Sequence, residues 1–255
     1  MSSGNIISVE SLSKVYAARS KAKIVAIENV SFQVQSGSFL SIVGPSGCGK
    51  STLLKAVAGL VLPTTGDIFV FNDRVREPIS NVGFVFQSSL LMPWRTVLDN
   101  VLLPVELLHK EKKKYSSRAL ELLDLLGLNS FEKRYPRELS GGMQQRVAIA
   151  RALIHDPELL LMDEPFGALD EMTRDQMGIE LLRITEKMKK TVLFVTHSIP
   201  EAVLLGDKVL VMSNRPALIK ANYEIDIPRP RSSRTRLDPK YIEYCQKVRE
   251  VLGIA

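Results

Sequence analysis

Hydrophobic and polar positions alternate in short runs along the first third of the chain. β-branched and aromatic residues at a period of two predict strands in the runs IISVE, IENVSFQVQ and SFLSIVG. After the third run the pattern changes to a glycine-rich turn and then to the helical period of KSTLLKAVAGL. Two further strand candidates follow, GDIFVFN and NVGFVFQ. The opening third therefore predicts several strands and one strand–turn–helix unit.

The period becomes helical from about Thr96 to Leu126, in VLDNVLLPVELL and SSRALELLDLLGL. The second segment has one apolar stripe, made of Ala119, Leu122, Leu123 and Leu126. The charged run HKEKKK between the two segments indicates a solvated connection, and GGMQQRVAIARALI predicts a further helix. We expect residues of about 88–155 to form a helical subdomain inserted into the main fold.

Continuous apolar runs follow in LLLMDEP, TVLFVTH and KVLVMSN, and such runs are typical of fully buried parallel strands. Strands that alternate with helices predict an α/β fold with a parallel core. We expect the main domain to span residues 1–225. The remainder, 226–255, is a basic extension in which PRPRSSRTR predicts extended chain. A short helix should follow, with Asp238 as N-cap and Pro239 at its first position.

Composition narrows the class of protein only slightly. The 255 residues are 45% hydrophobic and 24% charged, which is ordinary for a folded domain and argues against disorder. The net charge of +6 fits contact with nucleotides or an anionic membrane, and it also fits many other proteins. No apolar run reaches the roughly 18 residues that a membrane helix needs. Cys48 and Cys245 belong to no paired motif, which favours a reducing compartment.

A phosphate-binding loop is predicted between the third strand and the first helix. The segment GPSGCGKS matches G-x-x-x-x-G-K-[ST]. In such a loop backbone N–H groups converge on the phosphates, Lys50 reaches the β- and γ-phosphates, and the Ser51 hydroxyl binds Mg²⁺. The alternative is a structural glycine-rich turn, which the flanking strand and helix disfavour. The loop and the residue after it are Gly44, Pro45, Ser46, Gly47, Cys48, Gly49, Lys50, Ser51 and Thr52.

Two adjacent acids, Asp163 and Glu164, end the buried run LLLMDE. The carboxyl ends of parallel strands are where open α/β sheets bind ligands. Asp163 is placed to hold Mg²⁺, and Glu164 to orient or deprotonate the attacking water. A charged turn at the end of a strand is the alternative, and the phosphate loop in the same chain argues against it.

The segment LSGGMQQR resembles the signature sequence of ABC ATPases. Ser140, Gly141 and Gly142 open a helix and offer free N–H groups to an anion. The resemblance implies the ABC ATPase fold: a P-loop core with an N-terminal antiparallel β region and the inserted helical subdomain. It also implies that Ser140, Gly141, Gly142 and Gln144 bind ATP in trans, so that two ATP molecules lie between two subunits.

Further positions match motifs of the same family over about residues 6–225. Gln87 resembles the glutamine that contacts Mg²⁺ and water, and Ala168-Leu169-Asp170 resembles the D-loop at the dimer seam. His197 resembles the switch histidine that contacts the γ-phosphate, and Tyr16 resembles the aromatic residue that stacks on adenine. Each would usually be structural if it occurred alone. Glu164, His197, Gln87 and Lys50 are the expected catalytic residues, with Ser51, Gln87 and Asp163 around Mg²⁺.

The segment SSLLMPWRTVLDNV resembles ATPase subunits of importers for nitrate, sulfonates and taurine. In these, Met92, Pro93 and Trp94 would receive a membrane permease, although Trp94 is equally suited to covering the local core. The resemblance implies an ATP-hydrolysing importer subunit on the cytoplasmic face of the inner membrane. Its partners would be a second, identical subunit, a permease and, indirectly, a substrate-binding protein, with no nucleic acid.

Two other functions stay open at this point: an ABC ATPase of a lipid or metal transporter, and one that serves a soluble assembly. The basic extension has three possible roles, as a dimer contact, a membrane-surface contact or a solvated tail.

Overall fold

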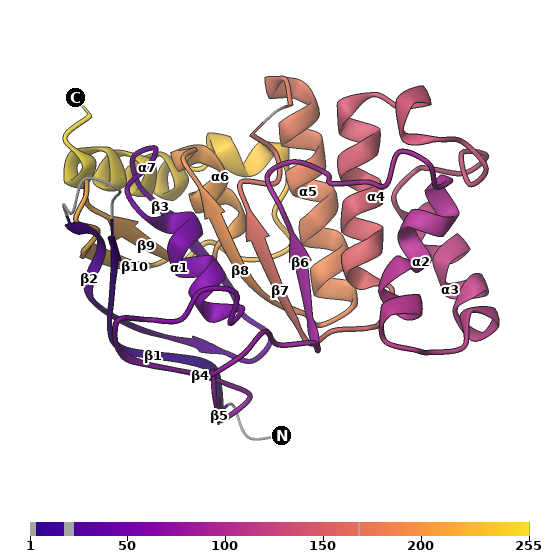
Figure 1. Cartoon of the computed structure of the whole chain (residues 1–255). Coiled ribbons are helices and arrows are strands. Elements are labelled where there is room, and N and C mark those ends of the chain that lie inside the picture. The colour runs from indigo at the N-terminus through magenta and orange to yellow at the C-terminus, as the bar shows by residue number, and fades with distance from the viewer. Residues whose placement is uncertain (1–3, 18–22, 168, 255) are drawn as a thin grey trace.

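The computed structural model describes residues 4–17, 23–167 and 169–254 and contains two sheets and several helices (Figure 1). The first sheet is antiparallel and lies at the N-terminal side of the molecule. Its strands, in spatial order, are β2 (Lys23–Gln35), β1 (Asn5–Ala17), β4 (Thr65–Val70) and β5 (Asp73–Arg74). The predicted N-terminal antiparallel region is confirmed.

The second sheet is the core of the fold. Its spatial order is β10 (Ile219–Glu224), β9 (Lys208–Met212), β3 (Phe39–Val43), β8 (Thr191–Thr196), β7 (Leu159–Asp163) and β6 (Val82–Val85). All neighbours are parallel except β10, which is antiparallel to β9. Every residue of β3, β7 and β8 is buried, as expected for continuous apolar strands covered on both faces.

Alternate residues of the central strands face two separate hydrophobic cores. Leu40 and Ile42 pack with α1 (Lys50–Val57) and the antiparallel sheet. Phe39 and Val43 pack on the other side of the sheet, with the last three helices. These are α5 (Glu171–Lys187), α6 (Ile199–Leu205) and α7 (Pro239–Leu252). Because successive side chains of β3 point to opposite faces of the sheet, this one strand contributes to both cores.

The remaining helices lie together beyond the β6 edge of the sheet (Figure 1). They are α2 (Val97–Leu107), α3 (Lys112–Leu125), the short 3₁₀ helix η1 (Pro136–Glu138) and α4 (Gly141–Leu153). All four residues of the predicted apolar stripe on α3 and its C-terminal turn are buried. Among the described residues, no helix has both the length and the apolar character needed to cross a bilayer.

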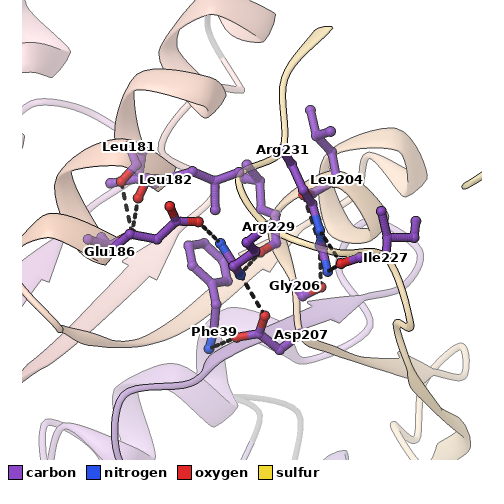
Figure 2. A network of polar contacts seen from close by, with 12 residues as sticks. Phe39, Leu181, Leu182, Glu186, Leu204, Gly206, Asp207, Ile227, Arg229 and Arg231 are labelled. Carbon is purple, nitrogen blue, oxygen red and sulfur yellow. Dashed lines mark hydrogen bonds and ion pairs between the residues drawn. The ribbon is translucent and has the colours of Figure 1, made fainter. Parts of the chain in front are cut away.

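The C-terminal extension is tied to the core by two arginines (Figure 2). Arg231 is only 4% exposed, and its guanidinium donates to carbonyl oxygens of α6 and of the chain before η2 (Ser233–Leu237). Arg229 forms ion pairs with Glu186 of α5 and with Asp207. The alternative that this segment is merely a solvated tail is therefore wrong, because its basic side chains stabilise the fold. The next segment follows the prediction, since Asp238 caps α7 and Pro239 begins it.

Candidate active site

The loop before α1 folds around the ammonium group of Lys50. Its Nζ donates to the carbonyl oxygens of Gly44 at 2.9 Å and Pro45 at 3.0 Å. Gly49 has a φ of 133°, and a Cβ there would lie 2.7 Å from the Ala26 carbonyl oxygen on β2. Only glycine fits this position, since a side chain would push the loop away from β2. The loop thus holds a buried cation at the point where a helix begins.

Ser51 and Asp163 meet beside the loop. The Ser51 hydroxyl donates to Asp163 Oδ1 at 2.7 Å, and Asp163 is 6% exposed at the end of β7. Burial raises the pKa of the Asp163 carboxyl, while the bond from Ser51 opposes that shift. A hydroxyl and a carboxylate side by side are the oxygen ligands that Mg²⁺ prefers, so these residues fit the metal that the motifs imply.

Glu164 is held between two basic side chains. It follows β7 with a φ of 44°. Its Oε1 lies 3.4 Å from Lys50 Nζ, and its Oε2 lies 2.8 Å from Nδ1 of His197, which follows β8. A Cβ on Gly167 would lie 3.8 Å from Glu164 Oε2 and 3.9 Å from Gln87 Nε2, so Gln87 borders the same space. The structure therefore brings together all four residues that the sequence assigns to catalysis.

The signature residues lie elsewhere on the molecule. Ser140 is exposed and caps α4, its hydroxyl accepting from the Met143 N–H at 3.3 Å. Gly141 and Gly142 form the first turn of α4, and Gln144 follows in the next. This helix packs against the edge strand β6, whereas α1 packs against β7 and β8. The signature residues and the phosphate loop thus lie on different helices of one chain, as the expected exchange between two subunits requires.

Two further predicted residues stand at the borders of the site. Asp170 caps α5 by accepting from the Thr173 N–H at 3.0 Å, and this bond lowers the Asp170 pKa. Ala168, in the same predicted D-loop, lies outside the described residues. Tyr16, near the end of β1, is 38% exposed, with Lys14 Nζ 5.2 Å from its ring centroid. The Tyr16 residue is thus partly open to solvent.

Sequence reasoning missed Arg215, which follows β9. Its Nη2 donates to the carbonyl oxygen of Gly47 in the phosphate loop at 2.7 Å. The bond braces the exposed tip of the loop from a segment 168 residues away in sequence. Arg215 is a basic residue just beyond the carboxyl end of a parallel strand, where open α/β sheets bind ligands, and this position was the signal that could have identified it.

Comparison with known proteins identifies the family. The ABC transporter family profile matches residues 27–167. The chain belongs to the ABC transporter family. This ABC ATPase is similar to a solved dimeric ATP-binding cassette in a post-hydrolysis state bound to ADP and Pi. The match has a TM-score of 0.77 and 33% sequence identity, and it covers 87% of this chain and 100% of that chain. The fold and the ATP hydrolase activity expected from the sequence are confirmed.

Curated relatives match this ABC ATPase over most of its length. The aliphatic sulfonates import ATP-binding protein SsuB of Bacillus cereus is 44% identical over 89% of this chain and 88% of its own. The taurine import ATP-binding protein TauB of Rhizobium johnstonii is 44% identical over 97% and 96%. The nitrate import ATP-binding protein NrtD of Synechocystis is 39% identical over 96% and 94%.

Exposed large apolar side chains lie in the helical part of the ABC ATPase. Trp94 is 72% exposed, so the alternative that it covers the local core is wrong. The buried side chain of Asn100 fixes this turn by accepting from the Met92 N–H at 2.7 Å and donating to the Met92 carbonyl at 3.1 Å. Leu90 and Leu107 are also exposed. Exposed large apolar side chains on a rigid turn are typical of a protein interface.

Proposed function

We propose that this ABC ATPase drives uptake of a small molecule of the sulfonate, taurine or nitrate class through a separate membrane permease. The relatives named above support the substrate class, and the exposed surface around Trp94 supports a permease over a soluble assembly. The ATPase works as a homodimer, peripheral to the cytoplasmic face of the membrane, and a substrate-binding protein delivers the cargo. The observation that carries the chemistry is the cluster of Lys50, Glu164 and His197 beside the phosphate loop.

Lys50 binds the phosphates. In this structure its ammonium is satisfied by two loop carbonyls and by Glu164. An ammonium held at the mouth of converging backbone N–H groups is poised to exchange these partners for the β- and γ-phosphate oxygens of ATP. The exchange neutralises charge on the transferred group and releases Glu164 from its ion pair.

Glu164 orients the attacking water and accepts its proton. His197 Nδ1 lies 2.8 Å from the Glu164 carboxylate, and this hydrogen bond fixes the carboxylate and the orientation of the ring. The other ring nitrogen is then free to face the γ-phosphate. Gln87 borders the same space and is placed to hold the water. A positioned general base of this kind contributes about 10²–10⁴-fold to the rate.

Ser51, Asp163 and Gln87 would hold Mg²⁺. When bound, the ion neutralises phosphate charge and aligns the β- and γ-phosphates. The signature residues Ser140, Gly141 and Gly142 of a second copy complete the site from the opposite side, and Asp170 lies at the seam between the copies.

The catalytic assignment is tested by Glu164→Gln in the purified chain. We expect ATP affinity to stay within about threefold of wild type while turnover falls about 100-fold or more, because the amide cannot accept the proton. Glu186→Gln is the matched control, since Glu186 pairs with Arg229 away from the site. Wild-type turnover in Glu164→Gln would contradict the assignment.

The transport assignment is tested by purifying the tagged chain from detergent-solubilised membranes of its own cells. We expect a multi-span permease to copurify, and Trp94→Ala to reduce its recovery while ATP binding is retained. Recovery of only soluble partners would support the non-transport alternative and leave the ATPase chemistry intact.

A further inference from the structure

A buried carboxylate outside the cluster described above lies behind His197. Glu201, on α6, is 7% exposed, and burial raises its pKa. Its Oε2 accepts from the Thr196 hydroxyl at 2.6 Å, and its Oε1 lies 3.5 Å from Arg174 Nε. Burying a carboxylate costs free energy unless hydrogen-bond and ion-pair partners are well placed around it. A functional role of Glu201 would account for this cost.

On one side, Glu201 fixes the backbone around the switch histidine. Thr196 is the last residue of β8 and immediately precedes His197. While the Thr196 hydroxyl donates to Glu201, the same oxygen accepts from the Ser198 N–H at 2.9 Å. The residues before and after His197 are therefore held by one hydroxyl, and Glu201 sets the direction of that hydroxyl.

On the other side, Glu201 faces the loop at the start of α5. Arg174 Nη2 donates to the Leu169 carbonyl at 2.8 Å, directly before Asp170. Its Nε points toward Glu201 but makes no hydrogen bond within the described part of the chain. The contact between Arg174 and Glu201 is thus a long ion pair, and a small movement of either side chain would shorten it to a hydrogen bond.

We propose that Glu201 is a positioning residue that couples the Leu169–Asp170 loop to His197. Contact of a second subunit with Asp170 shifts the Leu169 carbonyl and Arg174, and Glu201 passes that shift through Thr196 to His197. The contact of His197 with Glu164 is already made at 2.8 Å in this structure, so the shift places the other ring nitrogen of His197 against the γ-phosphate when the dimer is closed. The proposal rests on the role assigned above to His197.

The test measures kcat, KM for ATP and urea unfolding of the purified full-length chain carrying Glu201→Gln. We expect kcat to fall about 10- to 100-fold, since small displacements of catalytic groups have effects of this size. KM should stay within about threefold, because Glu201 does not face the nucleotide. Glu186→Gln, which removes a different carboxylate–arginine pair on the same side of the sheet, should keep kcat within about twofold. A kcat for Glu201→Gln equal to that of Glu186→Gln would overturn the proposal.

A second variant tests the link from its other end and covers the case in which Glu201→Gln does not fold. Thr196→Val removes the hydroxyl and should lower kcat by a similar factor without raising KM. In the double variant the two losses should not multiply, because both break one connection. Multiplying losses, or an unchanged kcat in Thr196→Val, would overturn the coupling.

His197→Ala serves as the reference. Wild-type turnover in His197→Ala would refute the role of the histidine itself. Loss of turnover in His197→Ala together with normal turnover in Glu201→Gln would refute only the role of Glu201.

Discussion

Replacing Arg231 by methionine removes the donors that hold the C-terminal extension to the core. Methionine keeps most of the side-chain volume and cannot donate a hydrogen bond. In the native structure the guanidinium donates to five carbonyl groups, those of Val203, Leu204, Gly206, Ile225 and Ile227. Three of them lie at the C-terminal end of α6, where helical carbonyls lack partners of their own.

The expected loss of stability follows from these contacts. The Ile225 carbonyl retains the Ile227 N–H, so four carbonyls lose their donor. A buried polar group without a partner costs about 1–3 kcal/mol, which puts the loss near 6 kcal/mol. Burial lowers the Arg231 pKa well below its ordinary value, to about 10, so removing the charge regains about 3 kcal/mol. We expect a net loss of about 3 kcal/mol in the free energy of unfolding.

Urea unfolding followed by circular dichroism measures this loss. For a chain of this size the dependence on urea is about 3 kcal/mol per molar, so the midpoint should fall by about 1 M. Arg234→Met is the matched control, because Arg234 is exposed in the same segment and should change stability by less than about 0.5 kcal/mol. An Arg231→Met midpoint equal to that of Arg234→Met would refute the reasoning.

Two further predictions concern the phosphate loop. Lys50→Ala should weaken ATP binding about 10- to 100-fold in a calorimetric titration, because this is the range expected for the loss of a charged hydrogen bond. Undiminished affinity would count against the role of Lys50. Cys48 is 2% exposed, and burial raises the pKa of its thiol, so the reactive thiolate is scarce at pH 7.5. We expect alkylation by iodoacetamide to be about tenfold or more slower than in the urea-unfolded chain. The rate should increase as the pH rises. Modification of Cys48, located by peptide mass spectrometry because Cys245 is also buried, should block ATP binding, and full binding after complete modification would contradict the prediction.

The strands of the core and the phosphate loop were predictable because local sequence determines them. Each buried strand is a run of apolar residues, and the loop needs its glycine and lysine at fixed spacing. Strand β10 was not predicted, because its half-buried residues alternate with exposed polar ones in the short run IKANYE. Only pairing with β9 makes it a strand. Helix α5 was also not predicted, since its sequence EMTRDQMGIELLRITEK is mostly polar.

The side chains that sequence reasoning missed share a physical cause. Arg215 and Arg231 donate to backbone carbonyls, which every residue carries and no sequence pattern marks. Glu201 contacts Thr196 close by, but its second partner, Arg174, comes from another helix. The residues that meet ATP are constrained by the chemistry of a fixed ligand and recur in recognisable motifs. Those that hold the loops of the site in register are constrained only by the fold, so their roles emerge once the elements have been placed.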